Sequence, residues 1–160
     1  MSSFLKFSKS NAKLTNRLIF NLPAGFSCPF AKACKTISNP KNGKITDYQR
    51  EGDVKIFRCF SASSEARSAN ARALRWHNYN LLREESLFSM RDLIVKSIQH
   101  LNDPFKKISN EDKLCRIHES GDFFSENYMH AWFLAARHFP EIKFYAFTKS
   151  LDYWFDLYPL

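Results

Sequence analysis

The sequence predicts an α/β fold with a short parallel sheet of about three strands joined by helical crossovers. The clearest observation is a strand, helix and strand pattern between Leu114 and Thr148. A second is the apolar run from Leu14 to Leu22, which is typical of a buried strand. A third is the length of 160 residues, of which 44% are hydrophobic and 25% charged. These values suit one soluble domain, which we expect over residues 13–160.

The amino-terminal third is rich in turn residues. Residues 1–12 are polar and basic without a sustained period, which predicts a loose arm. Pro23 then stops the first strand, and a long loop at about residues 26–59 contains three of the four cysteines. A loop of this length inside a small domain is usually functional or disordered.

A helical region is predicted after this loop. Val54 to Phe60 reads as a short strand or an extended lead-in, and the Ser-rich segment that follows suits a helix start. Apolar residues then recur at helical spacing as far as Leu101. The pattern predicts either one long helix or two helices joined near Glu85.

The carboxyl-terminal half predicts a β-α-β unit. Its strands are Leu114 to Glu119 and Ile142 to Phe147, and the helix between them is Glu126 to His138. We expect Met129, Trp132 and Phe133 to face the sheet. Parallel strands would bring both carboxyl ends to one edge of the sheet.

The charge balance favours an anionic partner. The chain has 24 Lys and Arg against 16 Asp and Glu, giving a formal net charge of +8. Nucleic acid or a phosphorylated small molecule would suit this charge. The alternative is a basic surface that only keeps the chain soluble. The helical residues Arg72, Arg75, Tyr79 and Arg83 form one candidate nucleic-acid face. We find no apolar membrane span or export signal, so we expect a cytoplasmic protein.

The cysteine pattern indicates a metal site. Without an export signal, thiols are more often metal ligands or free than disulfide-bonded. Cys28, Cys34 and Cys59 could hold three irons of a four-iron cluster, or form a three-ligand zinc site that needs one further ligand. Buried or unpaired cysteines are the alternative. Cys115 lies in a strand pattern, which favours a core residue over a fourth ligand.

Polar residues gather where the two carboxyl-terminal strands end. α/β proteins place ligands at this edge, and the chain offers His118, Glu119, Ser120, Gly121, Asp122, Thr148 and Lys149 there. Gly121 allows a tight turn or a close approach of the backbone to a ligand, and Lys149 could bind a phosphate or carboxylate. A hydrogen-bonded core imidazole is the alternative for His118. The sequence has no P-loop, dinucleotide fingerprint or nucleophile elbow.

Five blocks of sequence resemble the phage "gene product eighty-eight" family. They are Asn21–Pro29, Arg58–Arg67, Arg75–Tyr79, Arg116–Phe123 and Phe144–Ser150. The resemblance runs from about Leu18 to Trp154 in the same order throughout. It implies a phage or prophage origin and no particular activity.

The order of elements also resembles, more distantly, the first half of a radical S-adenosylmethionine enzyme, a partial barrel. That resemblance implies that Cys28, Cys34 and Cys59 hold an iron-sulfur cluster whose open iron binds S-adenosylmethionine. It also implies that the turn from Ser120 to Asp122 contacts the methionyl amine. The cysteine spacing is less compact than in those enzymes, and about three β-α units fit here against their six or so. The sequence therefore leaves two hypotheses: a metal-binding protein of radical-enzyme ancestry, or a non-enzymatic basic binding protein that acts on nucleic acid or a host protein.

Overall fold

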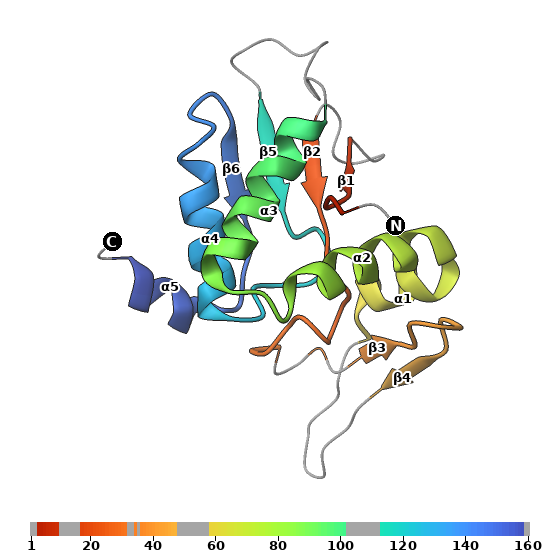
Figure 1. The fold of residues 1–160 in the computed structure, drawn as a ribbon. Helices are drawn as coiled ribbons and strands as arrows, with labels where there is room; N and C mark the ends of the chain where they lie inside the picture. The colour runs from red at the N-terminus through yellow and green to blue at the C-terminus, as the bar shows by residue number, and fades with distance from the viewer. Residues whose placement is uncertain are drawn as a thin grey trace.

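A computed structural model describes residues 3–9, 17–31, 34, 36–47, 58–101 and 113–158. The strands are β1 (Phe7–Ser8), β2 (Arg17–Phe20), β3 (Thr36–Ser38), β4 (Ile45–Asp47), β5 (Leu114–Ile117) and β6 (Lys143–Ala146). The helices are α1 (Phe60–Arg67), α2 (Ala69–Leu82), α3 (Leu87–His100), α4 (Glu126–Ala136) and α5 (Leu151–Leu157). Figure 1 shows how these elements are arranged.

The main sheet has the strand order β1-β2-β5-β6. β2 pairs in parallel with β5, and β5 pairs in parallel with β6, with Leu18, Cys115 and Phe144 in one row. β1 adds an antiparallel edge strand. The predicted α/β class with a short parallel sheet is confirmed, and so is the parallel pair at residues 114–147. The sheet is open and does not close into a barrel.

One face of the sheet forms the main core. Side chains alternate along a strand, and Leu18, Phe20, Cys115 and Ile117 all fall on this face and are buried. They pack with buried residues of α3 and α4 in one apolar cluster, and α3 crosses in front of β5 in Figure 1. The clustering confirms the core assignment of Cys115.

The sheet-facing side of α4 is largely as expected. Met129 and Trp132 are buried, whereas Phe133 is half-buried and packs edge-on against Trp154. Ser125 caps α4, because its hydroxyl accepts a hydrogen bond from the backbone N–H of Tyr128 at 3.2 Å. Phe133 is less buried than expected because it turns toward α5, which the sequence analysis did not predict.

The helical region between the cysteine loop and β5 is divided twice. Of the two alternatives, the break near Glu85 is the one found: it separates α2 from α3, and Ser86 caps α3. A further break falls at Ser68, whose hydroxyl accepts from the backbone N–H of Ala71 at 3.2 Å and caps α2. A serine between two helical runs thus starts a new helix.

The amino-terminal segment differs from the expected loose arm over residues 3–9. Leu5 is buried and its backbone N–H donates to Ser97 Oγ at 2.8 Å, while the N–H of Lys6 donates to Asn78 Oδ1 at 2.8 Å. These bonds fix the segment to α3 and α2, and the following residues of β1 pair with β2. The rest of the predicted arm, residues 1–2 and 10–12, lies outside the described residues.

The long cysteine loop contains a β-hairpin that its turn-rich composition did not predict. β3 and β4 pair as an antiparallel hairpin, closed by a turn at Asn39 to Lys44. The predicted strand or lead-in at Val54–Phe60 falls largely outside the described residues, apart from Arg58 and Cys59 before α1. Among the helices described, none combines the length and apolar character that crossing a membrane requires.

Candidate functional site

The candidate site lies where β2, β5 and β6 end. Their carboxyl ends meet at one edge of the sheet because the three strands are parallel. The segments that leave this edge contain Cys28, the turn from His118 to Asp122, and the turn from Phe147 to Ser150. The structure therefore brings together Ser120, Gly121, Asp122, Thr148 and Lys149, as the sequence predicted.

Asp122 joins the turns after β5 and β6. Its carboxylate accepts from the N–H of Phe123 at 2.8 Å, the hydroxyl of Thr148 at 2.5 Å and the N–H of Lys149 at 2.9 Å. Asp122 is also 4% exposed. The carboxylate that the radical-enzyme resemblance assigned to a ligand amine is thus occupied by the protein's own donors.

The turn after β5 packs closely on the segment that leads to Cys28. Gly121 has φ +83°, and a Cβ there would lie 2.5 Å from Ser27 Oγ and 2.7 Å from Leu22 Cβ. Ser120 N–H donates to Asn21 Oδ1 at 2.8 Å, and Leu22 N–H donates to Ser120 O at 3.0 Å. The backbone at Gly121 is therefore in close contact with Leu22 and Ser27 of the same chain, where the sequence allowed either a tight turn or a ligand.

The three predicted metal ligands are half-buried free thiols. Burial, together with the side-chain interaction with Cys59 and the charges of Cys59 and Cys28, raises the pKa of Cys34 to about 12. Lys149 acts in the opposite direction on Cys34. Burial raises the pKa of Cys28 to about 11, with smaller contributions from Asp122 and Cys59. The three thiols therefore interact with one another and with the strand edge.

The three thiols are not arranged as a metal-binding site in this structure. Within the described ranges, the structure contains no group of three or more His, Cys, Asp or Glu residues that could hold a metal ion as placed. Cys34 interacts electrostatically with Cys59, and Cys28 with both. Binding of a metal by all three would therefore require the loop to rearrange.

Cys59 is held by the hairpin. Its backbone N–H donates to Thr36 Oγ1 at 3.2 Å, and the Thr36 hydroxyl donates to Asp47 Oδ1 at 2.9 Å. Arg58 pairs with the same carboxylate. The hairpin thus fixes the backbone at the start of α1, where Cys59 occupies the N-cap position without a side-chain cap.

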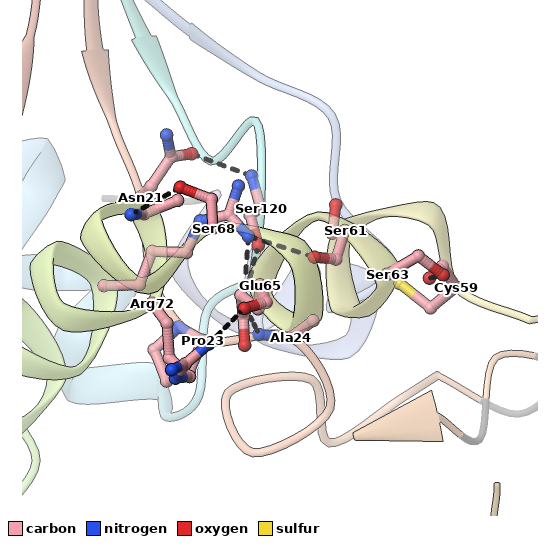
Figure 2. A network of polar contacts seen from close by, with 12 residues as sticks. Asn21, Pro23, Ala24, Cys59, Ser61, Ser63, Glu65, Ser68, Arg72 and Ser120 are labelled. Carbon is pink, nitrogen blue, oxygen red and sulfur yellow. Dashed lines mark hydrogen bonds and ion pairs between the residues drawn. The ribbon is translucent and has the colours of Figure 1, made fainter. Parts of the chain in front are cut away.

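Glu65 is the main polar residue that sequence reasoning missed. Its side chain is fully buried, and Oε1 accepts from Ala24 N at 2.9 Å, from Arg75 Nη1 at 3.0 Å and from Ser120 Oγ at 3.4 Å (Figure 2). Glu65 therefore ties α1, which follows Cys59, to the loop before Cys28 and to the turn after β5. The available signal was its position in the Arg58–Arg67 block.

The predicted basic helix face is wrong for two of its arginines. Arg72 is buried and donates to the backbone carbonyls of Glu65, at 2.6 Å, and Pro40, at 3.2 Å. Arg75 is buried and donates to Ser61 O at 3.1 Å as well as to Glu65. These arginines satisfy buried carbonyls and a buried carboxylate, so they are not free to bind nucleic acid.

His118 lies in the core and not on the open strand edge. It is 3% exposed, its Nε2 lies 3.0 Å from Tyr128 Oη, and its ring packs edge-on against Phe123. Burial lowers the pKa of His118 to about 3. The backbone φ is +65°, which a non-glycine residue seldom adopts. The core alternative named for His118 is the one that the structure supports.

The depressed pKa of His118 predicts a loss of stability in mild acid. The unfolded chain takes up a proton near the ordinary value of 6.5, whereas the folded chain does not until about 3. Stability from this residue is therefore complete above the unfolded pKa and falls as pH drops, by about 2 kcal/mol between about pH 7 and about pH 5. Urea unfolding of the parent and His118→Asn measures this. Equal pH slopes in the two proteins would contradict it.

Comparison with known proteins places the chain in a phage family. It is 30% identical over 127 residues to the Gene 88 protein of Mycobacterium phage D29, and the match covers 78% of this chain and 43% of that protein. It is 28% identical over 127 residues to the Gene 88 protein of Mycobacterium phage L5, covering 78% of this chain and 44% of that protein. This chain thus spans less than half the length of these curated relatives, and no solved structure matches it significantly. Because the model of the Gene product 88 family matches residues 5–159, the chain belongs to that family.

Proposed function

We propose that the protein binds a metal centre through Cys28, Cys34 and Cys59, most consistently an iron-sulfur cluster. The observation on which the proposal rests is the interaction of three free thiols from separate segments at the carboxyl edge of the sheet. Their donor set is all sulfur, which suits iron-sulfur clusters and zinc. Three thiolates leave one iron of a four-iron cluster open, whereas zinc would need a fourth ligand.

An open iron would supply a coordination site for S-adenosylmethionine, and residues of the strand edge would surround that ligand. Lys149 is exposed and already acts on Cys34, so its ammonium can offset the charge of a thiolate-bound centre. Ser120 and Thr148 already bond Glu65 and Asp122 through their hydroxyls, so they would shape the site, and Lys149 would contact the ligand. The role of Asp122 would differ from the one that the radical-enzyme resemblance implies. Asp122 would hold the turns after β5 and β6 in place and would not contact the ligand.

The metal proposal predicts a specific pattern of loss. Anaerobically prepared protein should contain iron and sulfide, and Cys28→Ala, Cys34→Ala and Cys59→Ala should each lose most of both. Cys115→Ala is the matched control. Cys115 is fully buried in the apolar core, so this variant should keep the metal content of the parent. Metal analysis and the visible absorption spectrum give the readout.

Three results would separate the alternatives. Zinc in place of iron would keep the cysteine site and remove the cluster. Neither metal, or an equal loss in Cys115→Ala, would overturn the proposal. Calorimetric titration of the metal-loaded parent with S-adenosylmethionine then tests the enzymatic part, since no binding would leave only a metal-binding protein.

A further inference from the structure

The second face of the parallel sheet has a composition different from the core face. By the alternation of the strands, Arg17 and Ile19 of β2 share this face with Arg116 of β5 and Tyr145 of β6. None of these four residues belongs to the main apolar cluster. Phe147, directly after β6, extends the row and is 72% exposed.

On this face two arginine side chains lie against two adjoining aromatic rings. The Arg17 guanidinium lies 5.9 Å from the centre of the Tyr145 ring and donates to its hydroxyl at 2.8 Å. The Arg116 guanidinium lies 5.4 Å from the centre of the Phe147 ring. Tyr145 and Phe147 meet edge to face at 6.2 Å. These contacts join four side chains into one continuous surface, which we call the Arg-aromatic face: Arg17, Tyr145, Phe147 and Arg116.

The positive charges of the Arg-aromatic face are not neutralised by the described residues. Arg58, Arg75, Arg83 and Arg91 each pair with a carboxylate. By contrast, no carboxylate within the described ranges pairs with Arg17 or Arg116, and the buried Nε of Arg116 has no hydrogen-bond partner there. Guanidinium groups that lie over aromatic rings keep their charge available for an anion.

We propose that the Arg-aromatic face binds single-stranded nucleic acid. Guanidinium groups bind phosphates through paired N–H donors, and an exposed ring beside them provides a platform on which a base stacks. The exposed Phe147 would stack a base while Arg116 and Arg17 bind flanking phosphates. The net charge of +8 favours the same polyanion. This inference is independent of the metal site, because it uses the opposite face of β5 from Cys115 and none of the proposed ligands.

Fluorescence anisotropy with a labelled single-stranded oligonucleotide tests the proposal on the full chain. We expect Phe147→Ala and Arg116→Ala each to weaken binding by about tenfold, since loss of a stacked base costs a factor of this order. Arg116→Ala should also reduce the slope of log affinity against log salt by about one. Phe147→Ala changes an exposed side chain, so its folding should be unaffected, as circular dichroism will show.

A matched control is available on α3. Arg91 lies over the Phe88 ring at 5.2 Å but pairs with Asp92, so Arg91→Ala removes a similar cation-ring pair whose charge is neutralised. This variant should bind like the parent. Absence of binding at low salt, or equal affinity of Phe147→Ala, Arg116→Ala and the parent, would overturn the proposal. A mononucleotide that binds as tightly as the oligonucleotide would overturn the assignment to a strand.

Discussion

Replacing Glu65 by alanine is expected to lower the free energy of unfolding by about 3–5 kcal/mol, the usual result of removing one partner from a buried ion pair. The carboxylate is fully buried, and its loss would leave Arg75 without its negative partner. The N–H of Ala24 would also lose its acceptor. Burial raises the pKa of Glu65 despite these donors, so the cost arises from the groups left unpaired and not from a strongly favourable pair.

Two variants define the Glu65 measurement. Glu65→Gln retains an oxygen acceptor for Ala24 and should cost less than Glu65→Ala. Glu84→Ala removes an exposed carboxylate that pairs with Arg83 and should change stability by less than about 1 kcal/mol. Urea unfolding followed by circular dichroism gives all three values. A Glu65→Ala effect no larger than that of Glu84→Ala would show that the network is unimportant for stability.

Replacing Trp132 by alanine should have an effect of similar size, about 3–5 kcal/mol. Trp132 is 1% exposed and packs edge-on against Phe20 at 5.2 Å, with Phe144 at 6.2 Å. It fills the space between α4 and the sheet, so truncation would remove the transfer free energy and leave a cavity. Domains of this kind are stable by only about 5–15 kcal/mol, so the variant should lose a large fraction of its stability.

Trp154→Ala is the control for this second prediction. Trp154 is 41% exposed on α5 and contacts Phe133 from outside the main core. We expect Trp154→Ala to lower the free energy of unfolding by less than about 1.5 kcal/mol, since much of this side chain is already exposed to solvent. Equal urea midpoints for the two tryptophan variants would contradict the placement of Trp132 at the centre of the core.

The parts of the fold that could be predicted are those with local periodic patterns. β5, α4 and β6 each show the repeat of their element, and Ser125 marks the helix start. β1 could not be predicted, because two residues have no period and their position depends on bonds from Lys6 to Asn78 and from Leu5 to Ser97. The hairpin was hidden because its strands have three residues each inside a turn-rich loop.

The candidate site was predictable in its location more than in the roles of its residues. Parallel strands bring their carboxyl ends together, so the meeting of Ser120 with Thr148 follows from topology. The roles of Asp122 and Glu65 depend on which donors tertiary structure brings to each carboxylate. Neither the three donors of Asp122 nor the pairing of Glu65 with Arg75 has a signature in local sequence.

The parallel pairing of β2 with β5 has a consequence for the order of folding. Leu18 pairs with Cys115, on the order of a hundred residues along the chain, so loop-closure entropy opposes this contact until other structure reduces it. The β5-α4-β6 unit closes over a much shorter segment and is the natural nucleus. Because β2 leads directly to Cys28, the cysteine segment would then reach the turn after β5, where Asn21 bonds Ser120, only when the sheet is completed.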